Sequence, residues 1–134
     1  MNKSLLFLAI SMMLISCRTN RVIDGKRVGL WIEHDTIEGS VYTSRGRYKN
    51  DFEVGKWRHF KNKTVVKTEK YRDSICLTTH YHANGNVRLQ GKTKLQEREN
   101  ELHWFYFGPW NEYDSVGNLL ETTVYENGLQ VDPD

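Results

Sequence analysis

A short unit, in which a glycine precedes a tryptophan by two residues and an aromatic or histidine residue follows, recurs three times in this chain. It spans residues 29–34, 55–60 and 108–113, with tryptophans at Trp31, Trp57 and Trp110. The first two tryptophans are 26 residues apart, and the next gap of 53 residues is close to two repeat lengths. Periodicity of this length is typical of repeat architectures, in which one supersecondary unit stacks on the next.

Turn sequences supply the other half of each unit. They lie at 81–87, where the missing third tryptophan unit should fall, at 113–119 and 125–128, with an earlier echo at 46–50. Asn-Gly and related pairs favour tight hairpins, and the glycine before each tryptophan lets the backbone enter its strand through a tight bend. A lone hairpin is marginal in water. Stacked hairpins, each covered by a neighbouring tryptophan, would form an elongated sheet.

Composition favours strands over helices. Beyond residue 16 the chain has one alanine, Ala83, no methionine, and 15 of its 16 aromatic residues. Helix formers are therefore scarce, whereas β-branched and aromatic residues are plentiful. We predict an all-β fold, an antiparallel meander of stacked hairpin repeats. The expected strands are 28–34, 39–49, 55–61, 64–71, 75–82, 86–96, 102–107, 109–114 and 118–126.

This pattern of Gly-x-Trp-x-x-Tyr, strand, Asn-Gly, strand and Tyr-x-x-Gly resembles the MORN-variant repeats of bacteria. The resemblance covers roughly residues 25–130. It implies an elongated MORN-like sheet and, from the usual description of that family, an association with toxin–antitoxin systems. Three features depart from the family pattern: His34 in place of an aromatic residue, Lys61-Asn62-Lys63 without a glycine, and a long charged stretch at 92–102. We expect an extended hairpin there, with its tip near 99–101.

The N-terminus has the order of a secretory signal: Lys3, an apolar run over 5–15, and the small residue Ser16. Cys17 follows directly, and Leu14-Ile15-Ser16-Cys17 resembles the lipobox of bacterial lipoproteins. The resemblance implies cleavage before Cys17 and lipid attachment to it. We expect a signal-peptide helix at 1–16, a tether at 17–27, the repeat domain at 28–130 and a tail at 131–134. An ordinary signal peptide with a chance cysteine is the alternative.

Charge limits the classes of partner. Without the signal the chain carries 18 basic and 17 acidic residues, a balance that argues against a general nucleic-acid binder. Basic residues gather at Arg18, Arg21, Lys26 and Arg27, beside the expected lipid. They could contact anionic headgroups, or simply keep the tether in water. In lipoproteins, an aspartate directly after the lipid-bearing cysteine is associated with retention in the inner membrane, and this chain has Arg18 there. The resemblance therefore implies that the protein is anchored in the outer membrane and faces the periplasm.

Cysteine and histidine offer weak chemical motifs. If Cys17 carries lipid, Cys76 has no disulfide partner within the chain, and its apolar surroundings predict burial. His80 and His82 would point to one face of a strand, and zinc would need a further ligand such as His59 or Glu69. The alternative is two exposed histidines. We predict no metal, no cofactor and no catalytic residues, since no nucleophile is paired with a base in a recognisable motif.

The run His103-Trp104-Phe105-Tyr106-Phe107 is the densest apolar segment beyond the signal. On a strand Trp104 and Tyr106 would face one side and the phenylalanines the other. Such residues either pack in a core or form an exposed interaction surface. We predict a surface made of Trp104, Tyr106, Tyr81 and Tyr71.

These features predict a non-enzymatic, lipid-anchored envelope protein whose repeat domain binds another protein. Three alternatives stay open. The first is an immunity or antitoxin role, which rests on the family resemblance alone. The others are glycan or lipid binding on Trp104 and Tyr106, and a metal-dependent role for His80, His82 and Cys76.

Overall fold

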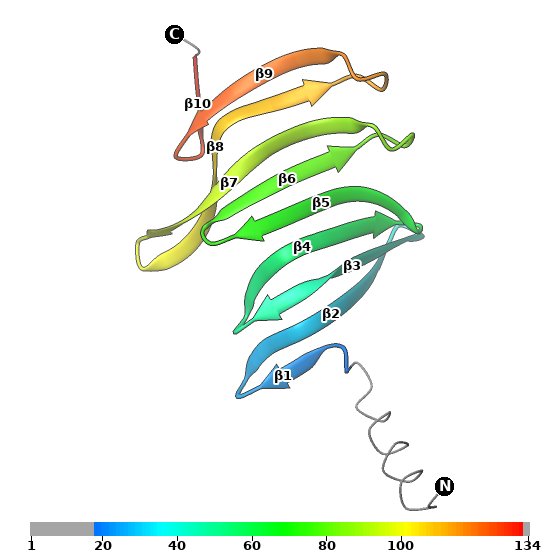
Figure 1. Ribbon diagram of the computed structural model, residues 1–134, viewed down its shortest axis with the longest axis vertical. Helices are drawn as coiled ribbons and strands as arrows, with labels where there is room; N and C mark the ends of the chain where they lie inside the picture. Colours follow the sequence, from blue (N-terminus) through cyan, green and yellow to red (C-terminus); the bar gives the residue numbers. More distant parts are fainter. Residues whose placement is uncertain (1–17, 133–134) are drawn as a thin grey trace, which may run out of the picture.

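The computed structural model describes residues 18–132, and the expected signal-peptide helix and Cys17 lie outside this range. The described chain is all-β, a single open sheet of ten antiparallel strands in which each strand pairs with the next in sequence (Figure 1). The meander expected from the sequence is thus confirmed. Its strands are β1 (Arg21–Ile23), β2 (Lys26–Ile37), β3 (Ser40–Lys49), β4 (Phe52–Lys61), β5 (Thr64–Arg72), β6 (Ile75–Tyr81), β7 (Val87–Arg98), β8 (Glu101–Tyr113), β9 (Leu119–Glu126) and β10 (Leu129–Val131).

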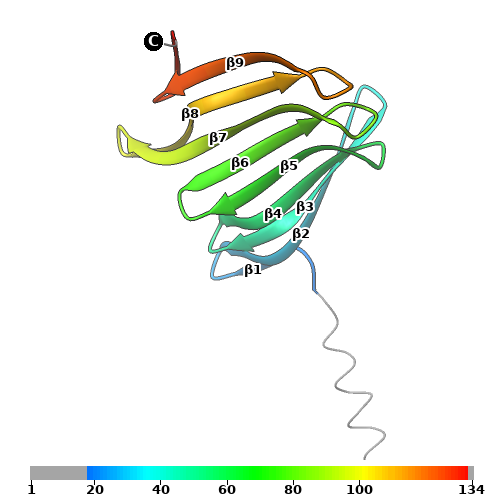
Figure 2. The same ribbon diagram turned by 45° about the horizontal axis from the view of Figure 1, so that its top comes forward.

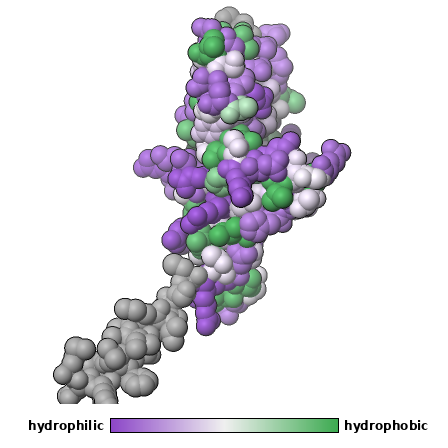
Figure 3. All heavy atoms as spheres, turned by 90° about the vertical axis from the view of Figure 1, so that its right-hand side faces the viewer, coloured by the Kyte–Doolittle hydropathy of each residue, from purple (hydrophilic) through white to green (hydrophobic). Residues whose placement is uncertain are grey.

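The sheet has one layer, so both of its faces meet solvent. Figure 2 shows the sheet twisted and curved, without a second layer of described residues against either face. Seen along the strands, the molecule is narrow, and hydrophilic side chains project to both sides (Figure 3). Among residues 18–132, four hydrophobic residues are buried, namely Tyr48, Trp57, Cys76 and Trp110. Because alternate residues of a strand point to opposite faces, the register places all four on one face, here called the aromatic face.

Trp57 and Trp110 are buried because each indole lies flat against a glycine of the preceding strand. A Cβ atom added to Gly46 would lie 2.0 Å from Cδ2 of Trp57, and one added to Gly91 would lie 2.1 Å from Cδ2 of Trp110. Each indole also donates a hydrogen bond to the carbonyl oxygen of the residue after that glycine, 3.1 Å away in both cases. The two repeats therefore share one packing arrangement. Burial of each indole stabilises the sheet by about 4–6 kcal/mol.

The aromatic ladder continues from these indoles. Tyr48 lies edge-on between Trp31 and Trp57, with ring centroids 5.5 Å and 4.9 Å away. Burial raises the pKa of Tyr48 to about 12, and Glu33 and Glu53 add to the rise. Trp31 belongs to the same ladder but is only half-buried. Its indole donates to the carbonyl of Val28 on its own strand, at 3.2 Å, rather than to a preceding strand.

The glycine two residues before each tryptophan has a left-handed backbone, as the bend at each repeat requires. Its φ is +74° at Gly29, +66° at Gly55 and +67° at Gly108. The sequence predicted Gly29 inside a strand, Gly55 at the start of one and Gly108 between two, and the structure places all three inside strands. Residues 102–107 and 109–114, expected as two strands, form the single strand β8. Pro109 is accommodated because residues 108–110 bulge away from the β7 ladder.

Two short strands were not expected from the sequence. β1 and β10 pair with β2 and β9 and close the two ends of the sheet. Residues 21–23 and 26–27, expected to be part of a tether, are therefore strand, and Val131 belongs to β10 rather than to a tail. A strand of three residues is too short to show an alternating pattern in the sequence. The tight turns beside these strands, Asp24-Gly25 and Asn127-Gly128, nevertheless indicate a hairpin at each end of the sheet.

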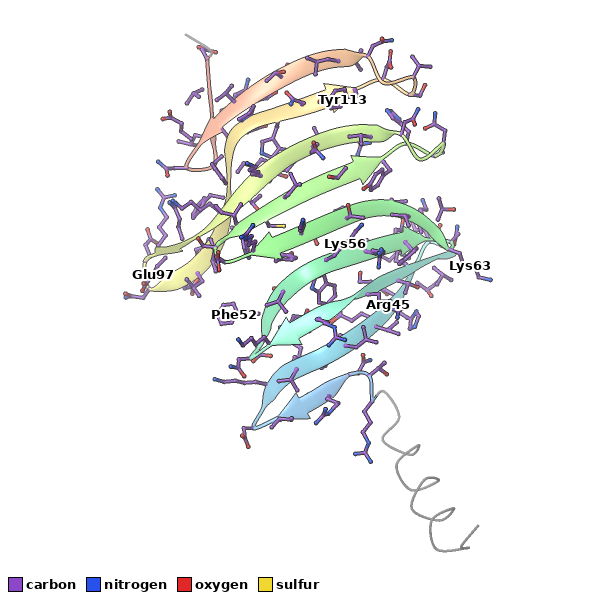
Figure 4. The ribbon with its side chains drawn as sticks, in the orientation of Figure 1. Arg45, Phe52, Lys56, Lys63, Glu97 and Tyr113 are labelled. Atoms are coloured by element: carbon purple, nitrogen blue, oxygen red, sulfur yellow. The ribbon has the colours of Figure 1, made fainter. Side chains whose placement is uncertain are left out.

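The hairpin that joins β7 and β8 projects beyond its neighbours (Figures 1 and 2). We call its outer part, residues 95–106, the arm. Its tip is formed by Glu99 and Asn100, both with positive φ, as the extended hairpin near 99–101 predicted. The tip residues of most other hairpins are also left-handed, including Lys63, where the unit lacks its expected glycine (Figure 4). A lysine with φ of +70° is strained by roughly 1 kcal/mol.

The packing of indole on glycine leads to a direct stability test. We expect Gly46→Ala to destabilise the domain by about 2–4 kcal/mol, because the added methyl group would overlap the indole of Trp57. Urea unfolding followed by tryptophan fluorescence measures the loss. The control is the same substitution in a Trp57→Ala background, where the methyl group finds space and the further cost falls below about 1 kcal/mol. Equal costs in the two backgrounds would contradict this packing.

Candidate interaction surfaces

Three of the four residues predicted to form an interaction surface lie together on the aromatic face. Trp104 and Tyr106 come from the arm and Tyr71 from β5. Trp104 packs edge-on against Tyr71 at 5.5 Å between ring centroids, and Tyr106 stacks on Trp110 at 4.3 Å. Trp104 remains 37% exposed and Tyr106 44% exposed. Both rings therefore pack with one side and offer the other to solvent, so they serve as core and as surface at once.

The arm covers the position where the third tryptophan unit is missing. On β6 this unit has Cys76 in place of the glycine and Thr78 in place of the tryptophan. In the other units the glycine pairs with a tyrosine on the next strand, whereas Cys76 pairs with Thr93 on β7. All three are buried. Tyr106 pairs with Thr93 in the register of β7 and β8, next to this gap. The arm thus places two aromatic rings beside a unit that itself has none.

A shallow hollow of about 210 Å³ lies between the arm and the start of β4. Tyr71, Trp104 and Leu95 line one part, and Phe52, 51% exposed, lines another. Figure 4 shows Phe52 at the start of β4, on the side of the sheet where the arm, marked by Glu97, projects. Burial raises the pKa of the Tyr71 phenol, so this group stays neutral and acts as a polar, uncharged part of the hollow. The hollow suits a partner's apolar side chain.

Tyr81 does not join this surface, contrary to the sequence prediction. Its hydroxyl makes a 2.9 Å hydrogen bond with the Thr68 hydroxyl, and Thr68 alternates with Glu69 of the aromatic face. Tyr81 therefore lies on the opposite face. The separation of the phenylalanines from Trp104 and Tyr106 is as predicted, because Phe105 and Phe107 pair with Lys94 and Lys92 on that opposite face.

The structure separates the two histidines that the sequence paired. A register shift follows His80, and His82 lies beyond the end of β6 in a turn. There its Nε2 atom donates to the carbonyl oxygen of Tyr113, 2.8 Å away, which joins two successive turns. His80 is half-buried beside Lys67 and Glu69, and burial lowers its pKa. Within residues 18–132 no group of three potential ligands is placed to hold a metal ion.

Sequence reasoning missed a polar cluster at the centre of the aromatic face. His59 lies between Ser44 Oγ, 2.9 Å from its Nδ1 atom, and Glu69 Oε2, 2.7 Å from its Nε2 atom. Lys67 Nζ donates to the other oxygen of Glu69 at 2.9 Å. Burial opposes ionisation of Glu69, but the hydrogen bonds from His59 and Lys67 lower its pKa to about 2. Only the register of β3, β4 and β5, with its bulge after His59, brings these residues together.

This cluster is better suited to stabilising the sheet than to catalysis. Ser44 lies in mid-strand and pairs with residues on both neighbouring strands. Acyl transfer needs free N–H groups aimed at a developing oxyanion, whereas the N–H groups of a paired strand already bond to its neighbours. Cys76 is likewise buried, as the sequence predicted, and burial raises the pKa of its thiol. That change makes the thiolate scarcer and the side chain less reactive.

Comparison with known proteins gives no relative: no family model, no curated protein and no solved structure matches the chain. Within the described residues no helix is long and apolar enough to cross a membrane. The described surfaces, rather than kinship, are therefore the basis for a functional proposal.

The charge on Glu69 predicts an acid-sensitive component of stability. Its carboxyl has a pKa near 4.5 when unperturbed and about 2 in the folded chain. The ionised group therefore contributes stability that is complete above pH 4.5 and is lost as pH falls from there toward 2. We expect Glu69→Gln to reduce stability at neutral pH by about 1–3 kcal/mol. We also expect this variant to have a free energy of unfolding that depends less on pH between 4.5 and 2. Urea unfolding at a series of pH values measures both effects.

The control is Glu121→Gln, which changes an exposed carboxylate on β9. That variant should keep the acid dependence of the parent chain. An unchanged slope below pH 4.5 in Glu69→Gln would show that the cluster does not stabilise the fold.

Proposed function

We propose that this chain is a lipid-anchored, non-enzymatic protein of the bacterial cell envelope whose β-repeat sheet binds another protein. The observation that carries the proposal is the pair of aromatic rings on the arm. Trp104 and Tyr106 are more than a third exposed although each packs against a further aromatic ring. Aromatic side chains that pack with one side and are exposed on the other, one of them lining a hollow, have the properties of binding hot spots. The resemblance to MORN-variant repeats supports the same reading.

The anchor is proposed from the sequence at Cys17 and is compatible with the start of the domain. Three residues, 18–20, separate Cys17 from β1, so the lipid would hold the sheet within roughly 10–15 Å of the membrane surface. Asn20 is already fixed to the sheet, since its side chain bonds to the N–H and C=O groups of Ile32. Such a short connection would keep one end of the sheet at the membrane. We propose that the anchor lies in the outer membrane and that the sheet faces the periplasm.

Metabolic labelling tests the anchor. Cells that express the full chain and are supplied with an alkyne analogue of palmitate should label this protein, and Cys17→Ala should abolish the label and release the protein from the membrane fraction. Cys76→Ala is the matched control, because Cys76 is buried in the sheet and should not accept lipid. Label that persists in Cys17→Ala would exclude the anchor.

Site-specific photocrosslinking in intact cells tests the binding surface. A photoreactive phenylalanine analogue at Tyr106 should give a discrete protein adduct. The same analogue at Leu120, which is 63% exposed on β9, is the control and should give little adduct. Trp104→Ala should weaken the Tyr106 adduct about tenfold, because truncation of a hot spot costs more than 1 kcal/mol. Equal adducts at both positions, or none at Tyr106, would contradict the proposed surface.

A further inference from the structure

The face opposite the aromatic ladder carries an ordered array of positive charge. Four strands each contain two basic residues separated by one residue, so both side chains point to the same face. The register shows that the four pairs share that face, here called the basic face. Its cations are Arg45 and Arg47 on β3, Lys56 and Arg58 on β4, Lys70 and Arg72 on β5, and Lys92 and Lys94 on β7.

These cations are exposed, and their charges are not neutralised within the described sheet. Each of the eight side chains is exposed. None takes part in the ion pairs found among residues 18–132. Like charges even stand directly opposite each other: Arg45 pairs with Arg58, and Lys56 with Lys70. Such cross-strand pairs are destabilising, so the arrangement costs the fold stability and calls for another explanation.

A row of apolar residues on β6, here called the furrow, divides the array. On β6, between the cations of β5 and β7, the basic face has Leu77 and Ile75 instead of charges. Lys70 and Lys92 flank Leu77 in register, and Arg72 and Lys94 flank Ile75. Ile75 also lines a hollow of about 390 Å³, together with the apolar residues Phe105, Phe107 and Val124 and the charged residues Lys94 and Glu126. Leu77 and Ile75 are therefore bordered on both sides by positive charge.

From this arrangement we infer that the basic face binds an extended acidic segment of a partner protein, laid along β6. Its apolar side chains pack on Leu77, Ile75 and the hollow, and its carboxylates pair with the flanking lysines and arginines. This inference rests on the proposed function, because it specifies the chemistry of the protein partner. A strand repeats its side chains about every 6.6–6.8 Å on one face, the same spacing as each pair of cations along β5 and β7.

The alternative occupants fit the face less well. A second copy of this chain is less suitable, because the carboxylates on its aromatic face, such as Glu33, Glu53 and Glu112, lie on separate strands around the aromatic ladder and do not follow one another along one extended segment. The phosphates of a nucleic acid would pair with the cations, but they would make no favourable contact with the aliphatic residues of the furrow. A flat anionic bilayer also leaves the recessed hollow unfilled. Only a segment that combines carboxylates with apolar side chains uses both features.

The experiment measures binding of a defined peptide to the purified full chain held in nanodiscs of neutral phosphatidylcholine. The probe is a fluorescent nonapeptide in which glutamate alternates with leucine and phenylalanine, and binding is followed by anisotropy at increasing salt. We expect saturable binding that weakens with salt. Replacing its glutamates with glutamine, or its apolar residues with serine, should each weaken binding about tenfold or more. Anionic phosphatidylglycerol vesicles and a single-stranded oligonucleotide are the competing probes.

Charge-matched variants locate the site. Lys70→Gln combined with Lys92→Gln should weaken peptide binding about tenfold. Lys26→Gln combined with Lys63→Gln removes the same charge away from the furrow and should change binding less than about twofold. Lys70→Glu is more specific still. It should abolish binding yet raise the unfolding midpoint, because it replaces the Lys56–Lys70 repulsion with an attraction. A residue with only a structural role would not change binding and stability in opposite directions.

The outcomes separate this inference from the proposed function. Tight binding of vesicles or oligonucleotide without peptide binding would overturn the acidic-segment inference, and so would peptide binding that ignores Lys70→Glu. In cells, a photoreactive residue at Leu77 should capture the same protein as one at Tyr106. An adduct at Tyr106 with none at Leu77 would overturn the inference while the proposed function survives. An absence of adducts at both positions would overturn both.

Discussion

The packing of an indole on a glycine of the preceding strand is the interaction on which this sheet depends. A one-layer sheet has no opposing layer to bury its side chains, so apolar surface must be buried against the sheet's own backbone. Trp57 and Trp110 do this by lying over Gly46 and Gly91, where any side chain would occupy the space of the ring. The hydrogen bond from each indole to the same neighbouring strand keeps its nitrogen satisfied when buried.

The same constraint explains where the repeat is broken. β5 has Glu69 where β3 and β7 have a glycine, and its neighbour β6 has Thr78 instead of a tryptophan. A glutamate can stand there because no indole has to lie on it, and the space is used by the cluster of Glu69, His59 and Lys67. The aromatic rings absent from this unit are supplied by the arm. Loss of one repeat tryptophan thus creates both a polar cluster and a place for exposed aromatic residues.

Because no second layer covers the sheet, its two faces can be specialised separately. The aromatic face holds the buried residues and, at the arm, the rings proposed to bind a partner. The opposite face holds four pairs of cations around an aliphatic furrow. The small net charge of the chain conceals this separation, since composition averages over faces that the strand register keeps apart. Alternation along strands turns a nearly neutral chain into one with a strongly basic side.

The sequence by itself determined the repeat, the all-β meander and most strand positions, because glycine, turn residues and tryptophan act through local backbone conformation and periodicity. Gly29, Gly55 and Gly108 adopt the left-handed conformation that their spacing suggested. Only the tertiary structure decided which residues become neighbours across strands. The placement of Tyr81 opposite Tyr71 follows from the register of β5 and β6, and His82 is separated from His80 because β6 ends at Tyr81. The Ser44–His59–Glu69 contacts depend on bulges in the β3–β4 and β4–β5 ladders that shift pairing by a residue or two. Such a shift changes the neighbours of every side chain that follows, and no local pattern records it.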